Sequence, residues 1–113
     1  MFVRIVTHNA ELPPEAQADV RARVERLGHY YHRIVSCRVA VDVPQRRTRT
    51  DAGLYGVRIA LKVPGGEVVV NHQPRENLAT ALDSAFNAAR RRLQDYARRQ
   101  RGAVKVHAPT GPE

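Results

Sequence analysis

The stretch LYGVRIALKVPGGEVVVN, residues 54–71, carries the strongest structural signal in the chain. Its first half alternates between apolar and polar side chains, which is typical of a half-buried strand. The apolar positions are Val57, Ile59, Leu61 and Val63, and the polar ones include Arg58 and Lys62. Pro64-Gly65-Gly66 predicts a turn, because proline fixes one φ and glycine permits a positive φ. Residues 67–71 then return antiparallel, which completes a β-hairpin.

Two other apolar runs predict two more strands. Residues 34–43 (IVSCRVAVDV) alternate in the same way, and Pro44 ends the run. Residues 2–7 (FVRIVT) are apolar on both sides, which predicts a strand in the centre of a sheet. Between the second and third predicted strands, residues 45–53 form a polar loop. This loop contains Arg46, Arg47 and Arg49.

Two segments repeat their apolar residues at the helical period. The first opens at Pro14, which suits the first helical position, and predicts a helix of about 17 residues. The second opens at Asn77, a good N-cap, and runs to about Arg101, where Gly102 is a natural stop. Its apolar stripe consists of Leu78, Leu82, Ala85, Phe86, Ala89, Leu93 and Tyr96.

The predicted order is β-α-β-β-β-α, which indicates an α+β sandwich. We expect a four-stranded sheet with both helices on one face, which leaves its other face open to solvent or to a partner. A length of 113 residues fits one domain. We expect this domain to span residues 1–102 and to be followed by a flexible C-terminal tail, residues 103–113.

The chain is strongly basic, with 19 Lys+Arg against 11 Asp+Glu and a net charge of +8. Such an excess favours a polyanionic partner, most commonly RNA or DNA. All but two of the cations are arginines, whose planar fork matches phosphate. No apolar run is long enough for a membrane span or a signal peptide, and the single Cys37 fits a reducing compartment. We therefore expect a cytoplasmic protein without a membrane partner.

Helical geometry places the arginines on particular flanks. In the first helix, Arg23 and Arg26 flank the apolar stripe. In the last helix, Arg92 and Arg99 form one row, and Arg91 and Arg98 form another about 100° away. Because only Asp95 lies among them, these rows predict a phosphate-binding surface. The alternative is that each arginine belongs to a solvated helix face or complements the helix dipole.

Other residues that could carry chemistry have simpler structural explanations. His29 and His32 are too few to hold a metal, since no third or fourth ligand accompanies them. Cys37 alternates into an apolar strand face, so it is predicted to pack rather than to act as a nucleophile. Tyr30 and Tyr31 either stack on a base or pack against the core, and packing is favoured. We find no acid–base pair or phosphate loop, and expect no catalysis, cofactor, metal or small-molecule substrate.

The chain resembles the short ribosome hibernation promoting factor and ribosome-associated inhibitor family, also called sigma-factor modulation proteins. The similar motifs are Arg23-Val24-Glu25-Arg26-Leu27, the turn Val63-Pro64-Gly65-Gly66-Glu67, Leu78-Ala79-Thr80-Ala81-Leu82-Asp83, and Arg91-Arg92-Leu93. The resemblance implies a fold akin to double-stranded RNA-binding domains. It also implies binding in the tRNA and mRNA channel of the small ribosomal subunit, which blocks translation and preserves idle ribosomes under stress.

By position, the resemblance makes Arg23, Arg26, Arg91 and Arg92 the rRNA contacts, whereas Arg98 and Arg99 rest on helix geometry alone. We expect a protein that is monomeric when free and whose partners are the small subunit and its rRNA. Two alternatives remain open. One is a general RNA-binding module that recognises duplex RNA by shape, and the other is a protein-interaction domain that uses its open sheet face.

Overall fold

The computed structural model describes residues 1–44 and 54–107, apart from the side chains of residues 72–73 and 101–107. The predicted loop 45–53 and residues 108–113 of the predicted tail lie outside the described residues. Within that part of the chain, no helix is long and apolar enough to cross a membrane.

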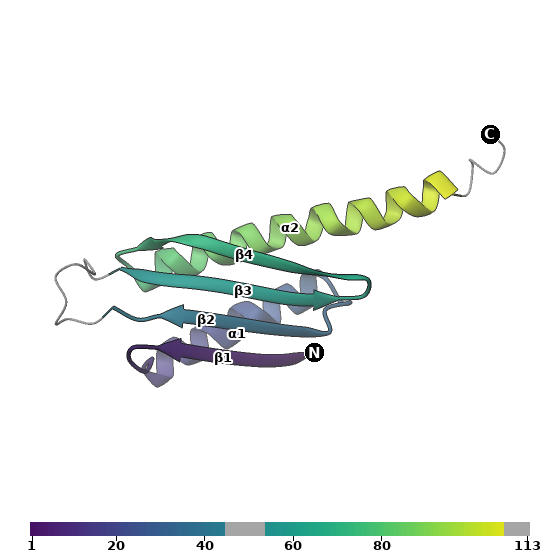
Figure 1. Ribbon diagram of the computed structural model, residues 1–113. Coiled ribbons are helices and arrows are strands. Elements are labelled where there is room, and N and C mark those ends of the chain that lie inside the picture. The colour runs from purple at the N-terminus through teal and green to yellow at the C-terminus, as the bar shows by residue number, and fades with distance from the viewer. Residues whose placement is uncertain (45–53, 108–113) are drawn as a thin grey trace.

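The observed order of elements is the predicted one, and the fold class is confirmed. The elements are β1 (Phe2–His8), α1 (Pro14–Tyr30), β2 (Ser36–Asp42), β3 (Tyr55–Val63), β4 (Gly66–Arg75) and α2 (Leu78–His107). The sheet has the order β1-β2-β3-β4, in which β1 and β2 are parallel and the other two pairs are antiparallel. Both helices lie on the same side of the sheet (Figure 1).

Strand β1 lies at the edge of the sheet, so the prediction of a central strand was wrong. A parallel neighbour needs a crossover connection, and α1 provides it by carrying the chain from β1 to β2. The later strands then add on the far side of β2, which leaves β1 outermost. Apolar residues on both sides of β1 do not indicate burial on both sides, since Val3 and Ile5 pack against the core whereas Phe2 is 81% exposed.

The core lies between the sheet and the helices, where the alternation of the strands meets the helical stripes. The inward residues predicted in β3 are all buried, and Arg58 and Lys62 point outward as expected. From the helices, Val20 and Val24 of α1 and Leu82 of α2 are fully buried. Cys37, Val39 and Val41 are buried in β2.

The turn between β3 and β4 has the predicted chemistry and is attached to α2. Val63 pairs with Gly66, so the loop contains only Pro64 and Gly65. Gly65 has φ +86°, a value that glycine adopts without steric cost. The Tyr96 hydroxyl donates a hydrogen bond to the Pro64 carbonyl, which joins the hairpin to the helix.

Helix α2 begins as predicted and ends later than predicted. The Asn77 side-chain oxygen accepts a hydrogen bond from the Thr80 N–H at 3.2 Å, as an N-cap does. The helical backbone continues through Gly102 to His107, so Gly102 does not end the helix. A glycine inside a helix costs only about 1 kcal/mol, which its neighbours can offset. As a result, α2 extends past the β3–β4 turn (Figure 1).

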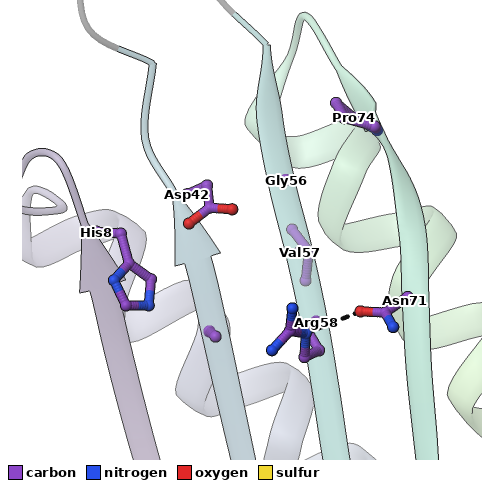
Figure 2. A pocket seen from close by; sticks show the side chains of 8 residues that line it. His8, Asp42, Gly56, Val57, Arg58, Asn71 and Pro74 are labelled. Atoms are coloured by element: carbon purple, nitrogen blue, oxygen red, sulfur yellow. Dashed lines mark hydrogen bonds between the residues drawn. The ribbon is translucent and has the colours of Figure 1, made fainter.

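The second face of the sheet carries no helix (Figure 1). The register places side chains on this open face in rows that run across the strands. One row consists of Arg4, Arg38, Ala60 and Val69, the next of Val6, Ala40, Arg58 and Asn71, and the last of His8, Asp42 and Gly56. Figure 2 shows the end of the face where the last two rows meet.

Candidate nucleic-acid interface

A groove between α1 and α2 brings two of the predicted site residues together. It has a volume of about 210 Å³. Its lining consists of Arg23, Arg26, Leu27, Tyr30, Asp83, Phe86, Asn87 and Arg90. We call this feature the interhelical groove. Three guanidinium groups in so small a space give it a cationic lining despite Asp83.

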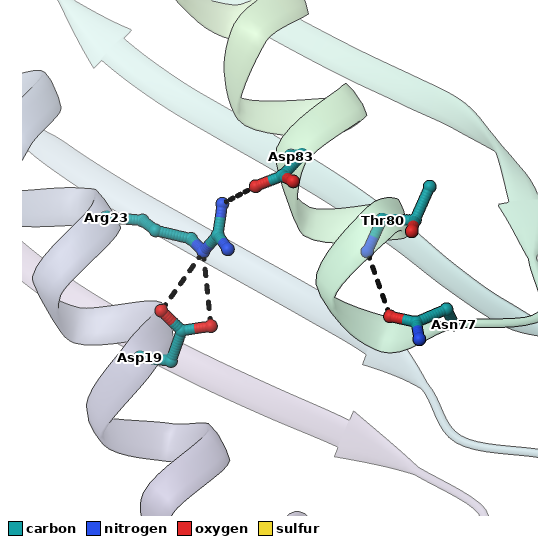
Figure 3. Close-up of polar contacts among 5 residues, drawn as sticks. All are labelled: Asp19, Arg23, Asn77, Thr80 and Asp83. Carbon is teal, nitrogen blue, oxygen red and sulfur yellow. Dashed lines mark hydrogen bonds and ion pairs between the residues drawn. The ribbon is translucent and has the colours of Figure 1, made fainter.

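Arg23 is the most enclosed of the three arginines and links the two helices. Its Nε lies 3.3 Å from both carboxylate oxygens of Asp19, one turn earlier in α1. Its Nη1 lies 2.5 Å from Asp83 Oδ1 in α2 (Figure 3). Only 14% of the Arg23 side chain is exposed, compared with 62% for Asp83. The positive charge of Arg23 is therefore already compensated by two carboxylates.

Arg26 and Arg90 supply the accessible charge of the groove. Arg26 is exposed and forms no ion pair with any residue that the structure describes. The Arg90 guanidinium lies 5.9 Å from the centroid of the Tyr30 ring, within the range of a cation–π contact. Tyr30 is 45% exposed, so the groove presents an aromatic face beside two cations. Tyr31, by contrast, packs against the core.

Arg90 is the groove residue that sequence reasoning did not select. Arg90 directly precedes Arg91 and Arg92 in the sequence, but the sequence alone could not indicate which flank of α2 faces α1. Arg90 lies about 80° from Leu82 around the helix, on the same flank as Asp83. The contact between Arg23 and Asp83 identifies that flank as the one beside α1.

The other predicted arginines lie on α2 outside the groove. Arg91 and Arg98 are opposite the buried stripe, about 160 to 180° from Leu82, and Arg92 and Arg99 occupy the flank away from α1. All four are exposed. No ion pair among the described residues involves them. We call these four residues the α2 arginine rows, and they extend the cationic surface along the helix.

The residues considered for catalysis or metal binding do not form a site. Cys37 is buried, and burial raises the pKa of its thiol to about 12, so the nucleophilic thiolate is scarce at neutral pH. His29 lies in the last turn of α1 and His32 just after the helix, and both are exposed. Among the side chains that the structure describes, no group of three His, Cys, Asp or Glu is arranged to hold a metal ion.

Comparison with known proteins gives one family and a consistent fold. A family model described as "Sigma 54 modulation protein / S30EA ribosomal protein" matches residues 3–101. The N-terminal domain of Protein Y from Thermus thermophilus superimposes with a TM-score of 0.69 at 21% identity, over 85% of this chain and 99% of that one. A ribosomal subunit interface protein from Coxiella burnetii gives a TM-score of 0.72 at 11% identity, over 86% and 98%. A search of curated protein sequences found no match.

Proposed function

The chain belongs to the sigma 54 modulation protein and S30EA ribosomal protein family, and on that premise we propose that it is a non-enzymatic ribosome-associated factor. It binds rRNA of the small subunit with the helical side of the molecule. In that position it occupies the channel used by tRNA and mRNA, inhibits translation and preserves idle ribosomes under stress. Its place of action is the cytoplasm, and it is monomeric when free.

The observation that carries this proposal is the distribution of cations on the helical side. The interhelical groove presents Arg26 and Arg90, and the α2 arginine rows continue the charge along one helix. The guanidinium groups of this surface can each engage a different phosphate of a folded RNA. Tyr30 adds a ring on which an unstacked base can lie.

Within this surface, the structure favours different roles for the predicted contacts. Arg26, Arg91 and Arg92 are exposed without a described ion pair, so they are proposed as direct phosphate contacts, together with Arg98 and Arg99. Arg23 is held by two carboxylates, so it is proposed to touch RNA only at the edge of its guanidinium and mainly to hold the groove in shape.

The test is co-sedimentation of the purified protein with ribosomes at physiological salt, with excess duplex RNA as competitor. A ribosome-specific factor stays bound in a stoichiometric amount. Loss to the competitor would favour a general duplex RNA-binding module, and absence of binding in every condition would contradict the proposal. Inhibition of translation in a cell-free extract should also saturate near one protein per ribosome, because occupancy rather than turnover causes it.

Charge-reversal variants test the surface itself. We expect Arg91→Glu with Arg92→Glu to lower ribosome affinity by at least about tenfold, because two phosphate contacts become repulsive. The matched control is Arg21→Glu with Arg33→Glu, which changes the net charge equally at exposed positions outside the groove and the rows. Equal losses for the two double variants would show that only the overall charge matters.

A further inference from the structure

The open face of the sheet carries a polar hollow on the side of the molecule opposite the interhelical groove. The hollow has a volume of about 170 Å³. It lies at the end of the face formed by the last two rows, and residues of all four strands line it (Figure 2). Ala40 and Gly56 form the floor of the hollow, because they are the smallest residues in these rows. Larger polar side chains, His8, Asp42, Arg58 and Asn71, rise around the floor.

The walls of the hollow offer one acceptor group and one donor group. The Asp42 carboxylate lies over Gly56, where its Oδ2 would be 3.4 Å from a Cβ at that position. On the other side, Arg58 Nε donates a 2.8 Å hydrogen bond to Asn71 Oδ1, which orients the guanidinium plane. Within the described part of the chain, Asp42 and Arg58 form no ion pair with each other or with any other residue.

These groups match the hydrogen-bonding edge of guanine better than that of the other bases. Guanine presents two adjacent N–H donors to a carboxylate and has O6 and N7 acceptors that suit an arginine. Adenine and cytosine would each direct a ring-nitrogen lone pair at the carboxylate beside their amino group, and uracil has a single N–H between two carbonyls. His8 adds an imidazole ring of the kind on which unstacked bases lie.

The surroundings of the hollow favour a base that belongs to an RNA strand. The volume is smaller than the roughly 300–1,000 Å³ of typical small-molecule sites, so it suits a single planar group. In the adjoining row, Arg4 and Arg38 are register partners and both are exposed. The two strands lie about 4.8 Å apart, and an anion between the two arginine side chains would offset the repulsion of their like charges. A phosphate next to the bound base would satisfy this pair.

We infer that the open sheet face binds single-stranded RNA, with one unpaired guanine in the hollow formed by His8, Asp42 and Arg58 and an adjacent phosphate on Arg4 and Arg38. This inference rests on the proposed function in that rRNA supplies the strand. The protein then contacts RNA with both of its faces, through charge on the helices and through a base on the sheet.

The first measurement is binding of short single-stranded RNA by fluorescence anisotropy, without ribosomes. The probes are the hexanucleotides UUGUUU, UUAUUU and the same strand with inosine in place of guanine. We expect the guanine probe to bind about tenfold more tightly than the adenine probe, with inosine between them because it lacks the 2-amino donor. Equal affinity for the three probes would overturn the inference.

Two matched variants locate the site. Asp42→Asn preserves the size of the side chain and should abolish the preference for guanine. Glu67→Gln removes one negative charge from an exposed position on β4, outside the hollow, and should leave the preference for guanine unchanged. A preference that survives Asp42→Asn would contradict the inference. Backbone amide shifts on addition of the guanine probe should cluster at His8, Asp42 and Gly56, and shifts confined to the interhelical groove would assign the base to that groove instead.

Free guanosine monophosphate distinguishes a strand from a nucleotide. We expect it to bind much more weakly than the hexanucleotide, because it lacks the phosphates on either side of the base. Equal affinity would overturn the assignment to RNA and indicate a nucleotide site. None of these measurements contains a ribosome. A negative result with the RNA probes would therefore not contradict ribosome binding, and a negative sedimentation result would not contradict binding of guanine to the sheet face.

Discussion

Arg23 shows how one side chain can fit a predicted pattern and yet have a different main role. Its position beside Arg26 predicts two equivalent phosphate contacts. In the structure, Arg26 is exposed, whereas the Arg23 guanidinium lies between Asp19 and Asp83 and joins two elements that are far apart in the sequence. The aliphatic part of Arg23 also packs in the groove, since only 14% of the side chain is exposed.

We therefore expect Arg23→Gln to lower the free energy of unfolding by about 1 kcal/mol, because a partly buried link between the helices is lost. Urea denaturation at low and high salt measures this effect. Arg26→Gln is the control on the same helix, and its stability should remain within about 0.5 kcal/mol of the parent. If instead Arg23→Gln is as stable as the parent and binds ribosomes poorly, Arg23 is a contact residue.

At the scale of elements, the hairpin and α2 stabilise each other. The Tyr96 hydroxyl reaches the Pro64 carbonyl, and Gly65 of the turn and Gly66 at the start of β4 both lie beside the Tyr96 side chain. This contact fixes the hairpin end of β3 and β4 against the helix. Arg91 and Arg92 precede Tyr96 and Arg98 and Arg99 follow it, so the α2 arginine rows continue on both sides of this contact along the helix.

Gly65→Ala should destabilise the protein by about 1 to 2 kcal/mol, because φ is positive there. A Cβ at this position would also lie 3.2 Å from the Tyr96 hydroxyl oxygen, which is closer than usual. Gly66→Ala is the matched control, since its nearest atom in α2 would be an ordinary 3.5 Å away. Thermal unfolding of the two variants compares them directly. A loss of stability for Gly66→Ala as large as that for Gly65→Ala would rule out φ as the cause.

The whole molecule places charge on both faces of a thin sandwich. The net charge of +8 makes attraction to any RNA strong at low salt. The proposed specificity arises from the arrangement of the cations around the interhelical groove and along α2. Charge alone and arrangement can be distinguished by how binding depends on salt.

The logarithm of ribosome affinity should fall linearly with the logarithm of salt concentration, with a slope that reports the number of phosphate contacts. We expect Arg91→Glu with Arg92→Glu to reduce that slope by about one for each lost contact. The control Arg21→Glu with Arg33→Glu should leave the slope as it is. An affinity that does not depend on salt would contradict RNA binding and favour a protein partner.

The sequence alone determined the class of each element, because periodicity and turn chemistry are local properties. The sequence alone predicted four such features, namely the alternation of β3, the start of α1 at Pro14, the N-cap of α2 at Asn77 and the glycine of the hairpin. The basic surface was also predicted, since arginine spacing on a helix follows from geometry. The end of α2 was not, because a glycine near the end of a helix can either stop it or be tolerated within it.

Only the tertiary structure decided which elements are neighbours and which charges meet. Strand β1 is at the edge because the crossover and the meander add strands on opposite sides of β2, and its own residues do not encode that order. Arg23 contacts Asp83, which lies 60 positions later in the sequence. The open-face hollow combines four strands whose register brings His8, Asp42, Gly56 and Asn71 together. Such contacts depend on packing between distant segments, for which no local pattern in the chain gives a signal.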